Sequence, residues 1–291
     1  MKRKGHVFAG YHAGVLFLYF AGTLLLTMSC MDPVCAALSL LAGCGYAGYL
    51  KGGRALRSSA RLYLPLLVLP AVVNPLVNGL GLTVLFTLGG APITLEAICY
   101  GLTAGGMLVS VMVWFSCYQQ IMTSDKFLHL FGRILPVTAM MVAMTLRYIP
   151  DTIRRGKEIS RAQAALRGGE PQAKTARVRH ALRMITVLMS WSMENAMETA
   201  DSMKARGYGG EKRTGYSHER LTQRDGWAAA ILLLLLAVSA VCLWRPDAQF
   251  RFYPFLGRPS ALPVGYAAYF LFMSFPLCLE GKEAWIWHRC R

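Results

Sequence analysis

The sequence predicts an all-helical integral membrane protein with about six transmembrane helices and two long cytoplasmic helices. Of the 291 residues, 55% are hydrophobic and only 16% are charged, and the mean hydropathy is +0.39. This composition is too apolar for an ordinary soluble domain. Apolar runs of membrane-spanning length occur in both terminal regions, and a charged block with helical periodicity separates them.

Six apolar runs come close to the length of about 20 residues that a helix needs to cross the hydrocarbon core. The first follows a basic start but has no small-residue cleavage site, so we expect it to remain as an uncleaved span. Residues 80–90 are apolar but short and lie among glycines, which favours a re-entrant or surface-lying segment. The six predicted spans are Tyr11–Ser29, Pro33–Leu50, Leu62–Asn78, Leu95–Met122, Trp227–Trp244 and Pro263–Leu279.

These runs divide the chain into three predicted regions. Residues 1–122 hold about four spans, residues 123–225 form a cytoplasmic domain, and residues 226–291 hold about two spans. The net charge of +16 would also suit a nucleic-acid-binding protein, but Lys and Arg residues beside membrane spans mark the cytoplasmic side. With the N-terminus inside, 28 Lys and Arg residues lie in cytoplasmic segments and three outside. We therefore expect a multi-pass protein in the lipid bilayer with both termini cytoplasmic, and no nucleic-acid partner.

The first half of the charged block predicts a short amphipathic helix, an apolar stretch and a charged helix. Thr123-Ser124-Asp125 supplies N-cap side chains for a short amphipathic helix, which we expect to lie at the membrane interface and to end at Pro136. An apolar stretch then reaches Tyr148. Pro150 with Asp151 predicts a new helix start, and the charged helix that follows ends at Arg167, before two glycines and a proline.

A second, longer helix is expected from about Ala173 to Arg206, where Gly207 stops it. At roughly 1.5 Å per residue it would be about 50 Å long. Its middle mixes apolar residues with the carboxylates of Glu194, Glu198 and Asp201. A helix that is apolar over so wide a face, yet lies in the cytoplasm, needs a partner that buries it.

Both helices end in an Arg-Gly pair. Glycine adopts the left-handed cap conformation without steric cost, so Gly168 and Gly207 leave Arg167 and Arg206 on blunt helix ends, and the small Ala205 keeps the second end narrow. The guanidinium fork is suited to carboxylates in a protein groove. The alternative is that each Arg only complements the helix dipole, which contributes about 0.3–1 kcal/mol.

Several motifs follow one another in residues 123–226: Thr123-Ser124 with Lys126-Phe127, Leu146-Arg147-Tyr148-Ile149-Pro150, Ala162-Gln163 before Arg167-Gly168, Met203-Lys204-Ala205-Arg206-Gly207-Tyr208, and Arg213-Thr214. Taken in this order, they resemble the transmembrane T component of energy-coupling factor (ECF) transporters. In the first hundred residues hydropathy does most of the matching. The signature Ala-Arg-Gly is intact at Ala205-Arg206-Gly207, whereas Leu166 stands in place of alanine before Arg167.

The resemblance implies a non-catalytic subunit of an ABC importer for a vitamin or metal ion, in the cytoplasmic membrane of a prokaryote. Two ABC ATPase subunits would grip the helix ends at Arg167-Gly168 and Ala205-Arg206-Gly207. A substrate-binding membrane S component would contact the apolar middle of the second helix, and no cofactor is implied. The residues expected to face the S component are Met184, Leu188, Met189, Trp191 and Met193.

Other function classes find less support in the residues. No G-x-x-x-x-G-K-[ST] motif is present, so ATP hydrolysis is assigned to other chains. The six histidines are scattered and the eight cysteines form no C-x-x-C pair, so we expect no metal site and no catalytic residue. Glu194 and Glu198, four residues apart, read as a solvated or partner-facing stripe rather than paired catalytic carboxylates.

The main alternative function is that of an ion-coupled secondary transporter, although apart from Glu96 the spans are nearly free of charge. A structural membrane scaffold is a further alternative.

Overall fold

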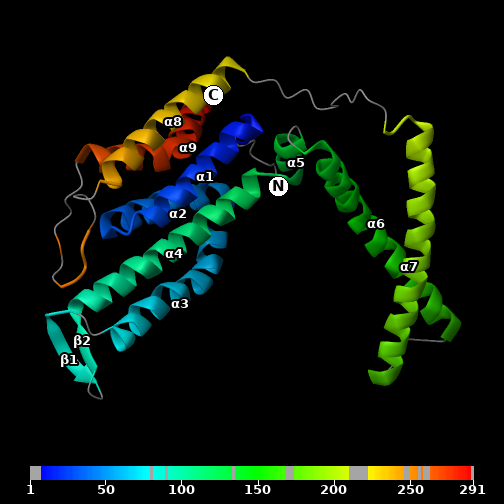
Figure 1. The fold of residues 1–291 in the computed structure, drawn as a ribbon, viewed down its shortest axis with the longest axis horizontal. Coiled ribbons are helices and arrows are strands. Elements are labelled where there is room, and N and C mark those ends of the chain that lie inside the picture. The colour runs from blue at the N-terminus through cyan, green and yellow to red at the C-terminus, as the bar shows by residue number, and fades with distance from the viewer. Residues whose placement is uncertain are drawn as a thin grey trace. The chain divides into compact units, whose positions relative to one another are not determined.

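The computed structural model describes residues 8–78, 81–88, 91–132, 135–167, 174–209, 222–245, 250–254, 257 and 263–289. It contains two compact units (Figure 1). The first, called the spanning unit here, comprises Met1–Phe127 and Glu219–Arg291, and the second, the helix-pair unit, comprises Leu128–His218. Helices make up most of the described chain, and the prediction of an all-helical membrane protein is confirmed.

Each of the six predicted spans corresponds to a helix of the spanning unit, although α3 starts nine residues before its predicted span and α9 ends ten residues after its predicted span. All but α1 are long and apolar enough to cross a membrane, while α1 is an apolar helix of 17 residues. The short 3₁₀ helix η1 (Phe8–Gly10) precedes them. Their bounds are α1 Ala13–Ser29, α2 Pro33–Lys51, α3 Gly53–Val77, α4 Leu95–Ile121, α8 Gln223–Leu243 and α9 Pro263–Arg289.

Buried polar side chains join the helices of the spanning unit. The Trp114 indole N–H on α4 donates to the Ser39 hydroxyl on α2 at 3.1 Å, and this hydroxyl lies 3.2 Å from the hydroxyl of Thr27 on α1. The Tyr19 hydroxyl donates to the backbone oxygen of Met273 on α9 at 3.0 Å. In an apolar environment such hydrogen bonds hold helices together, because an unpaired polar group is costly there. They connect α1, α2, α4 and α9 into one core.

Helices α3 and α4 lie side by side at glycines (Figure 1). A Cβ atom built on Gly101 would lie 2.5 Å from the backbone oxygen of Pro70, and one built on Gly105 would lie 2.5 Å from that of Leu67. Small residues four positions apart allow this close backbone approach between membrane helices. The two glycines therefore set the distance between α3 and α4.

The sequence did not predict the two strands between α3 and α4. Strand β1 (Val84–Leu88) lies in the stretch of residues 80–90 that was expected to be re-entrant or surface-lying, and it pairs antiparallel with β2 (Ala91–Thr94), which follows that stretch. Glu96, at the start of α4, is buried and accepts hydrogen bonds from the Thr83 backbone N–H at 3.3 Å and from the Thr83 hydroxyl at 2.5 Å. This carboxylate ties the hairpin to α4.

The helix-pair unit contains α6 (Pro136–Arg167) and α7 (Lys174–Ala205), each of 32 residues, and the short helix α5 (Ser124–Gly132) leads into it. The expected helix restart at Pro150 is wrong, because α6 runs through this residue without interruption. Proline removes one hydrogen bond, to Leu146, but its fixed φ angle suits a helix. Good helix formers on both sides, including Met144 and Arg154, continue the helix.

We predict that Gly105→Ala destabilises the spanning unit, because the added Cβ meets the rigid backbone of α3. The expected loss is on the order of 1–3 kcal/mol, measured as a lower midpoint of thermal unfolding in detergent micelles. Gly106→Ala is the matched control, since a Cβ there meets nothing within 4 Å. Equal midpoints for the two variants would show that the α3–α4 approach is not the constraint described here.

Candidate functional site

Helices α6 and α7 cross each other as an antiparallel pair (Figure 1). A Cβ atom built on Gly156 would lie 3.7 Å from the Cδ1 atom of Leu188, an ordinary van der Waals distance. Nearer the start of α6, the hydroxyls of Tyr148 and Thr199 lie 2.9 Å apart. The two helices therefore meet over the short stretch of α6 from Tyr148 to Gly156.

A cation–π contact supports the same crossing. The guanidinium carbon of Arg155 on α6 lies 4.5 Å from the centroid of the Trp191 ring on α7. An exposed contact of this kind contributes on the order of 0.5–1 kcal/mol. It flanks the Gly156–Leu188 approach, so the crossing rests on few side chains.

One side of each helix faces the other helix. On α7 the half-buried residues recur every three or four positions, the period of one helix face. Three residues that were expected to face the S component, Met184, Leu188 and Trp191, lie on this α6-facing side. The α7 residues of this side are Ala176, His180, Met184, Leu188, Trp191, Asn195, Thr199 and Met203.

The other two residues of that set, Met189 and Met193, lie on a second, exposed face of α7. Met193 is 70% exposed. Apolar residues follow one another here at spacings of three or four, a pattern that the sequence alone contains. We call this face the apolar stripe of α7; its residues are Val178, Leu182, Ile185, Met189, Met193 and Met197. A similar exposed set on α6 consists of Val142, Leu146, Ile149 and Ile153.

The C-terminal end of α7 has the geometry of a Schellman cap. Gly207 has a φ angle of +80°, its N–H donates to the oxygen of Lys204 at 2.9 Å, and the N–H of Tyr208 donates to the oxygen of Met203 at 2.9 Å. The predicted left-handed cap at Gly207 is thus confirmed. Arg206 is the last residue before the cap, and its side chain is exposed, as is that of Ala205.

The first Arg-Gly pair lies at the opposite end of the helix pair. Helix α6 ends at Arg167, and because the helices are antiparallel this end lies beside the start of α7, away from Arg206. Leu166, which precedes it, is 88% exposed. Gly168 falls outside the residues that the structure describes.

The chain leaves the spanning unit through α5 and returns to it at the start of α8. Both of these segments contact the same turn, at residues 9–12. The Lys126 ammonium of α5 donates to the backbone oxygen of Ala9, and the backbone N–H of His12 donates to Asp225 of α8 at 3.3 Å. Asp225 also forms a capping box with Thr222. Sequence reasoning missed this turn, although Thr222-x-x-Asp225 is a recognisable capping signal. The turn fixes where the chain leaves and re-enters the spanning unit.

Metal-ligating side chains do not gather anywhere in the described part of the chain. Within it, no three His, Cys, Asp or Glu residues come together in a way that could hold a metal ion. Glu194 and Glu198 both lie exposed on α7. The features that stand out are therefore two helix ends and the apolar faces between them.

Three named proteins are similar in sequence to part of this chain. Three proteins named energy-coupling factor transporter transmembrane protein EcfT are 31%, 29% and 33% identical, from Exiguobacterium sibiricum, Bacillus selenitireducens and Brevibacillus brevis respectively. The matches cover 36%, 53% and 37% of this chain. They span 40%, 65% and 40% of the length of those relatives, less than two thirds in each case.

A family model described as CbiQ, cobalt transport protein, matches residues 11–216. This range includes α1 to α4, the hairpin and the whole α6–α7 pair with the Arg206 cap. The chain therefore belongs to the CbiQ cobalt transport protein family, and its predicted resemblance to the transmembrane component of energy-coupling factor transporters is confirmed.

Proposed function

We propose that this chain is the non-catalytic coupling subunit of an ECF-type ABC importer in the cytoplasmic membrane of a prokaryote. Two ABC ATPase subunits bind the ends of α6 and α7. A membrane-embedded S component that binds the substrate, a vitamin or metal ion, contacts the apolar faces of the same helices. The chain transmits the ATP-driven movement of the first partners to the second.

The exposed Arg206 on a Schellman-capped helix end is the observation that carries the proposal. The cap satisfies the last carbonyls of α7 through backbone N–H groups, so the arginine is not needed to close the helix. An exposed arginine with small neighbours, Ala205 and Gly207, is suited to enter a groove of another protein. Its guanidinium fork would pair there with carboxylates.

The apolar stripe of α7 supports a second partner. Met189 and Met193 are 63% and 70% exposed, which a soluble surface rarely tolerates in a continuous row. Methionine side chains are flexible and polarizable, so they repack readily against a surface that moves or changes. The stripe and its counterpart on α6 are suited to an apolar membrane protein. The α6-facing residues Met184, Leu188 and Trp191 would support this contact indirectly, by holding the helix pair together.

The narrow crossing suggests how movement passes between the partners. When ATP draws the ATPases together, each pulls one helix end, and α6 turns relative to α7 about the Gly156–Leu188 contact. The apolar faces then present a different surface to the S component. Such a change follows ATP binding only if the ATPases bind the two arrangements with different affinity.

The proposed orientation places the helix-pair unit and both termini in the cytoplasm. This orientation rests on the distribution of Lys and Arg: 28 of these residues lie in the segments assigned to the cytoplasm, and three lie in the segments assigned to the outside. ATP is available on that side, and the ATPase-binding ends have to face it.

We predict that Arg206→Ala lowers substrate uptake by at least about tenfold, because buried arginine anchors dominate protein interfaces. The expected cause is lost retention of the ATPases, measured by copurification from membranes together with ATP-dependent uptake in vesicles. Membrane insertion should be unchanged, since the substitution lies outside the spans.

Arg206→Lys is the matched control for this prediction. It keeps the charge but loses the planar fork, so it should restore uptake only in part. If Arg206→Ala retains its ATPases and supports uptake at the normal rate, the chain does not couple through this end.

A separate prediction concerns the apolar stripe of α7. Met193→Glu should weaken retention of the S component by about tenfold or more while the ATPases remain bound, because a buried carboxylate has to be desolvated. Ser190→Glu, also exposed and on the same helix but outside the stripe, should have little effect. Retention is measured by copurification of each subunit, and equal behaviour of the two variants would place the S component elsewhere.

A further inference from the structure

The two ends of the α6–α7 pair differ in charge. The basic end, defined as residues 154–167 of α6 and 174–183 of α7, carries exposed cations on both helices: Arg154, Lys157, Arg161, Arg177, Arg179 and Arg183. Arg155 adds a further cation, over the Trp191 ring. In these two described stretches the only carboxylate is Glu158, which pairs with Arg154 at 3.3 Å.

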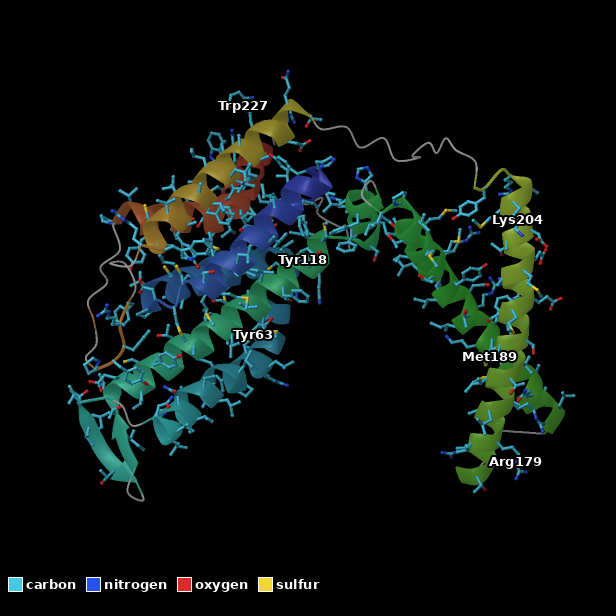
Figure 2. All side chains as sticks on the ribbon, in the orientation of Figure 1. Tyr63, Tyr118, Arg179, Met189, Lys204 and Trp227 are labelled. Atoms are coloured by element: carbon cyan, nitrogen blue, oxygen red, sulfur yellow. The ribbon has the colours of Figure 1, made fainter. Side chains whose placement is uncertain are left out.

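The opposite end, which carries Arg206, is mixed in charge. From residue 194 onward α7 presents three exposed carboxylates, Glu194, Glu198 and Asp201, with Lys204 and Arg206 following. The carboxylates share a face with Arg179 and Arg183, because all five recur at helical spacing. One face of α7 thus changes from basic to acidic along its length. Figure 2 shows Arg179 and Lys204 toward opposite ends of the helix, with Met189 between them.

Helix stability does not account for the charge distribution of α7. The helix dipole favours acidic side chains near the N-terminus and basic side chains near the C-terminus. The first turn of α7 has no acidic residue, and Arg177 and Arg179 lie close to its start. The placement opposes the dipole at this end, so a binding partner is a better explanation for it than the stability of the helix.

The cations of the basic end lie on both outer sides of the helix pair. With about 3.6 residues per turn, Lys157 and Arg161 lie on the side of α6 away from the α7-facing Gly156. Arg179 and Arg183 lie about a third of a turn away from the α6-facing side of α7. A flat membrane surface contacts one side of such a pair, whereas a concave groove contacts both. The distribution therefore favours a protein groove over anionic lipid.

We propose, on the basis of the function proposed above, that the basic end docks in an acidic groove of one ATPase subunit. The Arg206 end, with its carboxylates, docks in a less acidic groove. The carboxylates of the Arg206 end would be repelled by the acidic groove, since like charges across an interface are unfavourable, and the basic end would bind less strongly in the less acidic groove. The two ends are then not interchangeable, and charge determines which ATPase surface each one takes.

The test uses the full complex, purified through this chain with whichever ATPases accompany it. We prepare the pairs K157Q/R161Q and R179Q/R183Q; glutamine keeps helix propensity close to that of lysine and arginine. Each pair should raise the apparent Kd for the ATPases about five- to tenfold near 0.15 M salt. Each should also make ATPase retention less sensitive to salt, because fewer charges remain to be screened.

The control is S190Q/S192Q, which introduces glutamine at two exposed positions of α7 outside both charged ends and should not weaken ATPase retention. Circular dichroism checks that the helices persist in every variant. If both cation pairs retain the ATPases like the unaltered chain, with the same salt dependence, the charge proposal is overturned while the coupling function stands. If no ATPase accompanies the unaltered chain, both proposals fail.

A membrane-binding role for the basic end gives a different result. In that case the cation pairs would lose binding to vesicles containing phosphatidylglycerol but would keep their ATPases. Only one of the two pairs would then matter, since a bilayer meets one side of the helix pair. This outcome would also overturn the groove proposal.

Discussion

The short crossing of α6 and α7, where Gly156 lies near Leu188 and the hydroxyls of Tyr148 and Thr199 lie 2.9 Å apart, is the constraint on which the arrangement of the helix-pair unit depends. Two helices of 32 residues meet closely there, with the Arg155–Trp191 contact beside it. Because the interface is narrow, most of each helix stays exposed. Long exposed helices with apolar faces are unfavourable in isolation. They are suited to a subunit whose ends and faces belong to interfaces with other chains.

The spanning unit is held together by its own close contacts and hydrogen bonds. Glycines bring α3 and α4 into close backbone contact, and buried hydrogen bonds such as Trp114–Ser39 join α2 and α4. The turn at residues 9–12 holds Lys126 on one connection and Asp225 on the other. These two contacts hold the segments that precede α6 and follow α7 within the spanning unit. The proposed coupling function requires such fixed attachment points.

Hydropathy and capping signals were sufficient to predict the spans, the long second helix and the Gly207 cap, because each depends on local sequence. The helix restart at Pro150 was wrong, since one proline costs a helix a single hydrogen bond. The hairpin at residues 84–94 was not predicted, because two short strands carry a weak signal. The sequence also did not separate Met184 and Trp191, which face α6, from Met189 and Met193, which are exposed. That distinction depends on where the helices cross, and pairing between distant segments is not encoded in local periodicity.

Relative movement of α6 and α7 on ATP binding is the central claim, and a distance between spin labels tests it most directly. Labels at A165C and T175C, both exposed near the basic end, report the separation of the two helices in the assembled, cysteine-free complex. A second pair of labels, at T175C and S192C, lies on α7 alone and reports a distance within that helix. Pivoting predicts that ATP shifts the first distance by more than about 2 Å and leaves the second unchanged. An unchanged first distance in a complex that hydrolyses ATP and imports substrate would contradict it.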